Sequence, residues 1–167
     1  PRLGHEILPC YGLSEACCFV TISSPGAIVA RAVGTPADLD MLILAENSEG
    51  IEAPATAGER GEICIRGKSV ITHGYWKRPD TARDAYIDGY FRTGDIGFID
   101  AAGFLHITGR RKNMLIKGGE KFYLEDFDRA LSRVEGIRDT ACIVTHCDEN
   151  DDEYTCCVVA DNDVDEA

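Results

Sequence analysis

Four glycine-containing strings follow one another between Gly61 and Phe122, and they limit the folds open to this chain more than any other feature. In order they read GEICIRG, GYWKRPDTA, DGYFRTGD and GRRKNMLIKGGEKF. The first alternates isoleucine with other residues, the period-two pattern of a half-buried strand that ends at a glycine turn. Five residues separate Gly61 from Gly67-Lys68-Ser69, one more than a phosphate-binding P-loop has. The pattern therefore predicts a strand with an architectural role and excludes a P-loop.

The third string ends in Arg92-Thr93-Gly94-Asp95, and Arg110 follows Asp95 by fifteen residues. An ionised carboxylate presented from a glycine-bounded turn can accept two hydrogen bonds from a diol such as a ribose. The planar guanidinium of an arginine suits paired contacts to sugar or phosphate oxygens. Asp95 and Arg110 are therefore candidates for holding a nucleotide sugar. The alternative is a turn with an N-capping Asp95 and a surface Arg110.

Near the start stands the pentapeptide Tyr11-Gly12-Leu13-Ser14-Glu15, between an apolar pair and the run ACCFV. This order predicts a strand, a tight turn and the first turn of a helix with Ser14 as its N-cap. The amide groups at a helix N-terminus make a seat for phosphate, and Glu15 supplies the hard oxygen that magnesium prefers. The alternative is a buried tyrosine beside an ordinary capped helix.

The C-terminal part predicts a helix over residues 125–134, because Phe127, Leu131 and Val134 recur at helical spacing. Two strands, over residues 140–145 and 154–160, are expected to follow, joined by the acidic segment 148–153. That segment lacks the glycine and the glutamate that an EF-hand calcium loop requires. A solvated hairpin tip is therefore the better interpretation.

The order of these motifs resembles the adenylate-forming, or AMP-binding, enzymes, which include acyl-CoA synthetases, luciferases and the adenylation domains of peptide synthetases. The resemblance runs from Tyr11 to about residue 160, and the segment GYWKRPDTA is most similar to the acyl-CoA synthetase branch. It implies an α/β fold in two parts. Residues 1–110 would be the end of the large AMP-binding domain, with a barrel-like β subdomain, and residues 111–167 would be part of the small α/β C-terminal domain.

The family also has two segments that this sequence does not contain. One is a Ser/Thr/Gly-rich phosphate loop before the Tyr-Gly motif, and the other carries a catalytic lysine near the end of the small domain. The resemblance therefore implies a fragment, cut within both domains, that would be a poor catalyst or none by itself.

Roles for individual residues follow from the resemblance. Tyr11, with Gly12 beside it, would lie against the adenine, and Asp95 and Arg110 would hold the ribose. Ser14, where the family usually has threonine, would contact phosphate, and Glu15 would bind Mg2+, which makes these two the candidate catalytic residues.

Other positions are assigned in the same way. Lys112 would mark a hinge between the two domains, although a solvated lysine in a basic strip is the alternative. Gly118 and Gly119 would line the path of the pantetheine arm of coenzyme A. Cys10 would line the acyl pocket, and a short helix would begin at Pro79 to Thr81.

Enzymes of this family activate a carboxylic acid with ATP, giving an acyl-adenylate and pyrophosphate, and then transfer the acyl group to a thiol. The resemblance therefore implies ATP, Mg2+ and coenzyme A as cofactors and a small carboxylic acid as substrate. Two alternatives stay open. The chain could belong to an adenylation domain that loads a carrier protein, or to a non-catalytic nucleotide-binding or interaction module.

The formal net charge of −12 disfavours nucleic acid and anionic membrane surfaces as partners. No apolar run of about eighteen residues occurs, so no membrane span is expected, and a cytoplasmic location follows as the expectation. The eight cysteines form no Cys-x-x-Cys and the four histidines are scattered, which disfavours zinc and predicts reduced, buried thiols. The aromatic residues Tyr75, Trp76, Tyr86, Tyr90 and Phe91 are expected to be packing residues.

Overall fold

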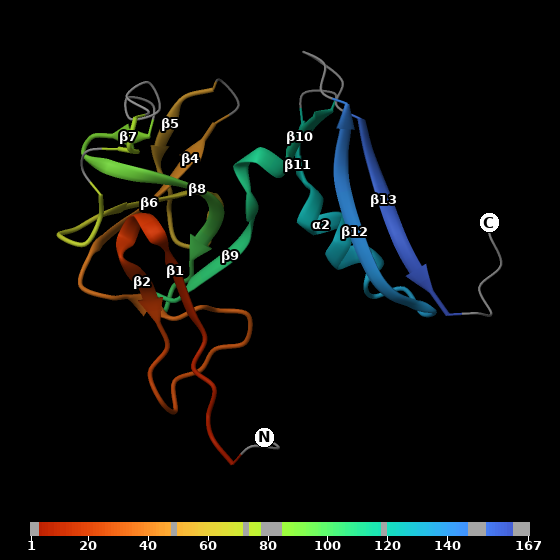
Figure 1. Cartoon of the computed structure of the whole chain (residues 1–167), viewed down its shortest axis with the longest axis horizontal. Helices are drawn as coiled ribbons and strands as arrows, with labels where there is room; N and C mark the ends of the chain where they lie inside the picture. Colours follow the sequence, from red (N-terminus) through yellow and green to blue (C-terminus); the bar gives the residue numbers. More distant parts are fainter. Residues whose placement is uncertain are drawn as a thin grey trace. The chain divides into compact units, whose positions relative to one another are not determined.

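The structure, a computed structural model, describes residues 4–47, 50–71, 74–77, 85–117, 120–146 and 153–161. The chain forms two compact units that divide between Ile107 and Thr108, three residues before the boundary expected from the sequence. Each unit is described by itself. The secondary structure of the described residues is mostly β-strand with few helical turns (Figure 1). It confirms the expected fold in two parts, a β subdomain followed by a smaller part with both helix and strands.

The first unit is built from two antiparallel sheets. In the smaller sheet the strand order is β1-β2-β3, and in the larger it is β5-β4-β6-β8-β7, with β9 also paired to β8. Their bounds are β1 (Cys10–Leu13), β2 (Cys18–Ile22), β3 (Thr35–Pro36), β4 (Asp40–Glu46), β5 (Glu52–Pro54), β6 (Gly61–Arg66), β7 (Tyr86–Ile87), β8 (Tyr90–Ile99) and β9 (Leu105–Arg110). The last three residues of β9 belong to the second unit.

Side chains from both sheets enclose one apolar core. Val20 comes from the smaller sheet, while Ile63, Ile65 and Phe91 come from the larger one, and all four are buried. Burying one such side chain contributes about 1.5–3 kcal/mol relative to leaving it in water. Two sheets closed around a shared core give this unit the barrel-like character that the sequence predicts.

Strand β6 is more deeply buried than its alternating sequence predicts. It lies between β4 and β8 in the larger sheet, and every residue from Gly61 to Ile65 is buried. Ile63 and Ile65 belong to the apolar core, whereas Glu62 and Cys64 alternate with them and are 5% and 0% exposed. The expectation of a half-buried strand is therefore wrong, because the second face of β6 is covered as well.

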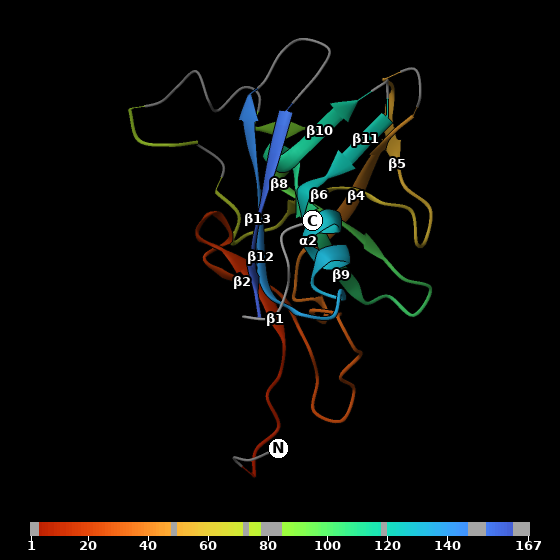
Figure 2. The same ribbon diagram turned by 90° about the vertical axis from the view of Figure 1, so that its right-hand side faces the viewer.

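The second unit consists of two hairpins and a helix, which Figure 2 shows from the side. The strands β10 and β11 pair antiparallel, as do β12 and β13. The expected helix and both expected strands are present, and the helix ends before Val134 because the N–H groups of Arg133 and Val134 bond to carbonyls three residues back. The bounds are β10 (Met114–Lys117), β11 (Glu120–Tyr123), α2 (Leu124–Leu131), β12 (Ile137–His146) and β13 (Glu153–Ala160).

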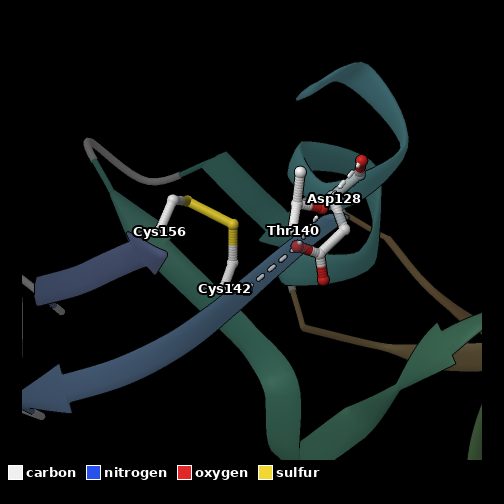
Figure 3. Close-up of a disulfide and its surroundings, with 4 residues drawn as sticks. All are labelled: Asp128, Thr140, Cys142 and Cys156. Atoms are coloured by element: carbon white, nitrogen blue, oxygen red, sulfur yellow. Dashed lines mark hydrogen bonds between the residues drawn. A yellow bond between two sulfur atoms is a disulfide. The ribbon is translucent and has the colours of Figure 1, made fainter. Parts of the chain in front are cut away.

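Two cysteines of the second unit are joined across its long hairpin (Figure 3). Cys142 and Cys156 stand directly opposite each other in the β12–β13 ladder and form a disulfide, with their Cα atoms 4.1 Å apart. Beside them Asp128 of α2 accepts hydrogen bonds from Thr140 Oγ1 at 3.0 Å and from the Cys142 N–H at 2.9 Å. The expectation of reduced thiols is wrong for this pair, because strand register rather than sequence spacing brings the two cysteines together.

The remaining described cysteines correct the expectation of buried thiols. Cys64 is buried in β6, as expected. The thiols of Cys10, Cys17, Cys18 and Cys157 are exposed. Cys10, Cys18 and Cys157 lie on strands that present these positions outward, and Cys17 lies in the turn before β2.

Candidate nucleotide-binding site

Tyr11 and Asp95, the residues expected to contact a nucleoside, lie 84 positions apart and meet in the first unit. Tyr11 is on β1 and Asp95 is on β8. The Tyr11 hydroxyl donates a hydrogen bond of 2.6 Å to Asp95 Oδ2, and Asp95 is only 6% exposed. An aromatic ring and a buried carboxylate are thus held next to each other.

Asp95 is presented by a bulge inside β8. In the ladder with β6, Arg92 stands opposite Cys64 and Ile96 stands opposite Glu62. The three residues from Thr93 to Asp95 therefore face the single residue Ile63. Gly94 adopts a φ of 74°, which side chains with a Cβ rarely tolerate. The glycine-bounded turn expected from the sequence is a strand bulge, a device that redirects a side chain next to a site.

Hydrogen bonds to β6 hold this bulge in place. Thr93 Oγ1 donates to the Ile63 carbonyl at 2.7 Å and accepts from the Asp95 N–H at 3.1 Å. The Gly94 N–H donates to Glu62 Oε1 at 3.2 Å. The threonine and glycine of the motif therefore fix the backbone from which Asp95 projects.

Arg92 completes the motif as a largely buried ion cluster with two glutamates. Its Nε donates to Glu62 Oε2 at 2.8 Å, and its Nη1 donates to Glu52 Oε2 at 3.0 Å. The side chains of Arg92, Glu52 and Glu62 are 17%, 25% and 6% exposed. The hydrogen bond to Glu52 raises the pKa of Arg92, so the guanidinium stays charged. The pairing of Glu52 and Glu62 with Arg92 was not predicted from the sequence. For Glu62 a signal was present, because an acidic residue in an otherwise apolar strand indicates a buried carboxylate that needs a partner.

The Tyr-Gly motif forms a tight hairpin instead of entering a helix. After β1, residues Ser14–Ala16 make a single 3-10 turn, whose capping residue is Leu13 and whose N-terminus has no side-chain cap. Cys17 then adopts a left-handed conformation, and the chain returns as β2. The expectation of a helix capped by Ser14 is wrong, because Leu13 already pairs with Cys18 across the hairpin. Ser14 stays exposed at the turn.

Gly12 is required by the close approach of the two strands of this hairpin. A Cβ on Gly12 would lie 1.7 Å from the Cys18 carbonyl oxygen. The hairpin also borders a hollow of about 500 Å³, whose lining includes Cys10, Gly12 and Ser14. Gly12, Ser14 and Cys10, which are expected near the adenine, the phosphate and the acyl group respectively, therefore line the same hollow.

Glu15 is held by a tyrosine from a distant segment. The Tyr75 hydroxyl donates to Glu15 Oε1 at 2.6 Å, and the Glu15 carbonyl accepts from the Ile71 N–H at 2.8 Å. Tyr86 in turn donates to the Ile71 carbonyl at 2.5 Å. The carboxylate expected to bind magnesium is therefore fixed through its side chain and its backbone.

The aromatic residues of this region divide into two groups. Tyr86 and Phe91 pack edge to face with ring centroids 5.5 Å apart, as packing residues do. The expectation of packing is wrong for Trp76, which is 88% exposed, and for Tyr75, which is 45% exposed and contacts a carboxylate.

Comparisons with known proteins identify the family of this chain. The profile of the family described as AMP-binding enzyme matches residues 1–76. The sulfoacetate–CoA ligase of Cupriavidus necator is 36% identical over 145 residues, which cover 85% of this chain and 28% of that protein. The ATP-bound crystal structure of MatB from Rhodopseudomonas palustris superimposes with a TM-score of 0.83 at 28% identity, covering 98% of this chain and 32% of MatB. The chain belongs to the AMP-binding enzymes.

A nonribosomal peptide synthetase of Aspergillus terreus, atqA, is also similar to this AMP-binding chain. It is 38% identical over 136 residues, which cover 76% of this chain and 14% of the synthetase. The chain spans about a third or less of the length of each of these relatives.

The remaining expected site residues of the chain are in the second unit or outside the described residues. Arg110 is exposed at the end of β9, and Lys112 is exposed in the 3-10 turn Arg111–Asn113. Next to them Asn113 Nδ2 donates to Glu125 Oε1 at 2.7 Å. Gly118, Gly119, Pro79, Thr81 and most of the acidic segment 148–153 lie outside the described residues.

Among the described residues, no group of three or more histidine, cysteine or acidic side chains could hold a metal ion. A magnesium ion needs fewer protein ligands, because it keeps several waters and binds one or two carboxylates together with substrate phosphates. Glu15 fits that requirement as a single carboxylate.

No helix in the described part of the chain is long and apolar enough to cross a membrane.

The contact between Tyr75 and Glu15 predicts an unusual titration. The hydrogen bond to Glu15 raises the pKa of Tyr75 to about 12 from the ordinary 10.0. A raised pKa means that this contact stabilises the fold fully below about pH 10 and that the stabilisation is lost as pH rises toward 12. In 13C-tyrosine NMR at pH 11, Tyr75 should be roughly one-tenth ionised in the wild type and mostly ionised in Glu15→Ala.

The matching variant Tyr75→Phe identifies the resonance, because it should remove that signal alone. If Tyr75 is ionised to the same extent at pH 11 in the wild type and in Glu15→Ala, the hydrogen bond to Glu15 does not raise the pKa of Tyr75, and the prediction is wrong.

Proposed function

We propose that this chain is part of an ATP-dependent acid:CoA ligase, which activates a carboxylic acid as an acyl-adenylate and transfers the acyl group to coenzyme A. The observation that carries the proposal is the Tyr11–Asp95 hydrogen bond, because it joins the two motifs that would hold a nucleoside. The similarity to a sulfoacetate–CoA ligase supports the choice of reaction. The chain spans 28% of that protein, so we expect the chain alone to be a poor catalyst or none.

In this proposal Asp95 binds the ribose. Its carboxylate accepts hydrogen bonds from the 2′ and 3′ hydroxyl groups, and the Tyr11 hydroxyl steadies Oδ2 while the Tyr11 ring lies against the adenine. The low exposure of Asp95 supports this role, because a hydrogen bond to a charged group is stronger away from water. Arg110 adds a second contact to the sugar.

The phosphates are assigned to the turn that follows β1. The Ser14 hydroxyl donates to a phosphate oxygen, and Glu15 is the protein ligand of magnesium. Glu15 Oε1 accepts the hydrogen bond from the Tyr75 hydroxyl, so Oε2 is the oxygen assigned to the ion. Magnesium, when bound, supplies positive charge that offsets the phosphate oxygens during the reaction.

Adenylation is then an in-line displacement. An oxygen of the substrate carboxylate attacks the α-phosphorus of ATP, and pyrophosphate leaves with the electron pair of the broken P–O bond. In the second step the thiol of coenzyme A attacks the acyl carbonyl, loses its proton, and AMP leaves. The residues named here act by positioning and by electrostatics. Lys112 is the proposed hinge between the two steps, and Gly118 and Gly119 line the pantetheine path.

A second candidate is an adenylation domain that loads a carrier protein. The similarity to the peptide synthetase atqA favours it, because that protein is 38% identical over most of this chain. Both candidates share the first half-reaction and differ only in the thiol that accepts the acyl group. A cytoplasmic location is part of the proposal in either case.

The test is ATP–pyrophosphate exchange by the gene product that carries this chain, measured over a panel of carboxylic acids. We expect exchange that depends on one class of acid, followed by thioester formation with coenzyme A. Transfer to a phosphopantetheinyl carrier protein instead would select the second candidate. ATP binding without exchange for any acid would contradict both and favour a non-catalytic nucleotide-binding module.

A further inference from the structure

Glu62 is a buried charged residue that the proposed reaction does not use. It is on β6, in the middle of the larger sheet, and is 5% exposed. A carboxylate in such a place costs free energy unless both of its oxygens are paired. Its position in the string GEICIRG predicts only a strand, so its role has to come from its contacts.

The two oxygens of Glu62 serve different partners. Oε2 accepts from Arg92 at 2.8 Å, and Oε1 accepts from the Gly94 N–H at 3.2 Å. Arg92 is held on its other side by Glu52, through Nη1 at 3.0 Å and through Nη2. The guanidinium is thereby fixed, and it fixes the orientation of the Glu62 carboxylate.

The Gly94 N–H belongs to the bulge that presents Asp95. A bulge interrupts the ladder hydrogen bonds between its two strands, and the Glu62 side chain supplies an acceptor for one of its backbone donors. Thr93 Oγ1 ties the preceding residue to β6 and accepts the Asp95 N–H. The backbone on both sides of Gly94 is therefore anchored, and Glu62 anchors Gly94 itself.

We propose that Glu62 is a positioning residue for the nucleotide site, because it holds the Gly94 amide and so sets where the Asp95 carboxylate meets the ribose. The inference rests on the proposed function, in which Asp95 is the ribose ligand. Arg92 serves this role indirectly, by orienting Glu62.

Glutamine cannot replace Glu62 in this role. Glutamine has one acceptor oxygen, whereas Glu62 uses both of its oxygens as acceptors. The charged guanidinium is the stronger donor, so the amide oxygen turns toward Arg92 and the amide NH2 group meets the Gly94 N–H. Glu52→Gln is the matched control. It removes the same charge beside the same arginine, and the amide oxygen of glutamine can still accept a hydrogen bond from Arg92, as Glu52 does.

The ligand test compares ATP with 2′,3′-dideoxy-ATP by calorimetric titration of the full chain. We expect the wild type and Glu52→Gln to bind ATP at least about tenfold more tightly than the dideoxy analogue, the loss that removing a charged hydrogen bond gives. In Glu62→Gln that ratio should fall toward one. A general loss of stability would weaken both ligands equally and leave the ratio unchanged, which would overturn the inference.

A second measurement needs no nucleotide. Hydrogen exchange of the Gly94 amide, followed by NMR, should be about tenfold or more faster in Glu62→Gln than in the wild type or Glu52→Gln, since the amide loses its acceptor. Unchanged exchange would overturn the inference. A wild type that fails to discriminate the two nucleotides would contradict the assignment of Asp95 to the ribose, whereas the exchange experiment would still decide whether Glu62 holds the bulge.

Discussion

Replacing Arg92 with alanine is expected to lower the free energy of unfolding of the first unit by about 3–5 kcal/mol. Arg92 neutralises Glu62, whose side chain is 6% exposed, and Glu52, whose side chain is 25% exposed. Without the guanidinium, the two carboxylates that it neutralises lose that positive charge next to the central strand of the sheet. Hydrogen exchange of the core amides of β6 and β8 under native conditions measures the loss.

The control for this prediction is Arg66→Ala. Arg66 also pairs with an acidic residue of the larger sheet, Asp40, but the two side chains are 50% and 64% exposed. Ion pairs that water reaches contribute no more than about 1 kcal/mol. Equal losses of stability in the two variants would contradict the view that the Arg92 cluster is a buried anchor.

Replacing Asp95 with alanine is expected to weaken ATP binding by about 2 kcal/mol, roughly thirtyfold in the dissociation constant. The carboxylate is the proposed acceptor for the ribose hydroxyl groups, and its removal also leaves the Tyr11 hydroxyl without the partner that lies 2.6 Å away. Calorimetric titration of the chain with ATP measures the change, and the Michaelis constant for ATP of the whole enzyme should rise in parallel.

Asp100→Ala is the matched control for the Asp95 variant. Asp100 directly follows the same strand β8, and its half-buried carboxylate is paired with His106 Nε2 at 2.9 Å. Its removal should leave the affinity for ATP unchanged. If Asp95→Ala binds ATP as tightly as Asp100→Ala does, the assignment of Asp95 to the ribose is wrong.

Much of the fold could be predicted from local patterns. The helix α2 and the strands β12 and β13 could be predicted from local sequence patterns, because the residues that define each element are neighbours in the sequence. The helix expected after Tyr11 could not be excluded in that way. Ser14 and Glu15 are suitable residues for a helix N-terminus, but pairing between β1 and β2 forces the chain to reverse at Cys17. Tertiary pairing overrides local preference here.

The site could be predicted in part. Tyr11, Glu15 and Asp95 stand out as polar residues within ordered motifs, so the resemblance to a family can single them out. Their supporting partners could not be found in this way, because Glu62 and Tyr75 become relevant only through contacts that register and burial decide. The Cys142–Cys156 disulfide was missed for the same reason, since the two residues face each other only once β12 and β13 are in register.

The central claim is that Tyr11 and Asp95 together form the nucleoside site of this AMP-binding chain. The most direct test is a crystal structure of the chain grown with Mg2+ and a non-hydrolysable ATP analogue. We predict the ribose hydroxyl groups within hydrogen-bonding distance of the Asp95 carboxylate and the adenine against the Tyr11 ring. A nucleotide bound elsewhere, or no nucleotide in the crystal at saturating concentration, would contradict the claim.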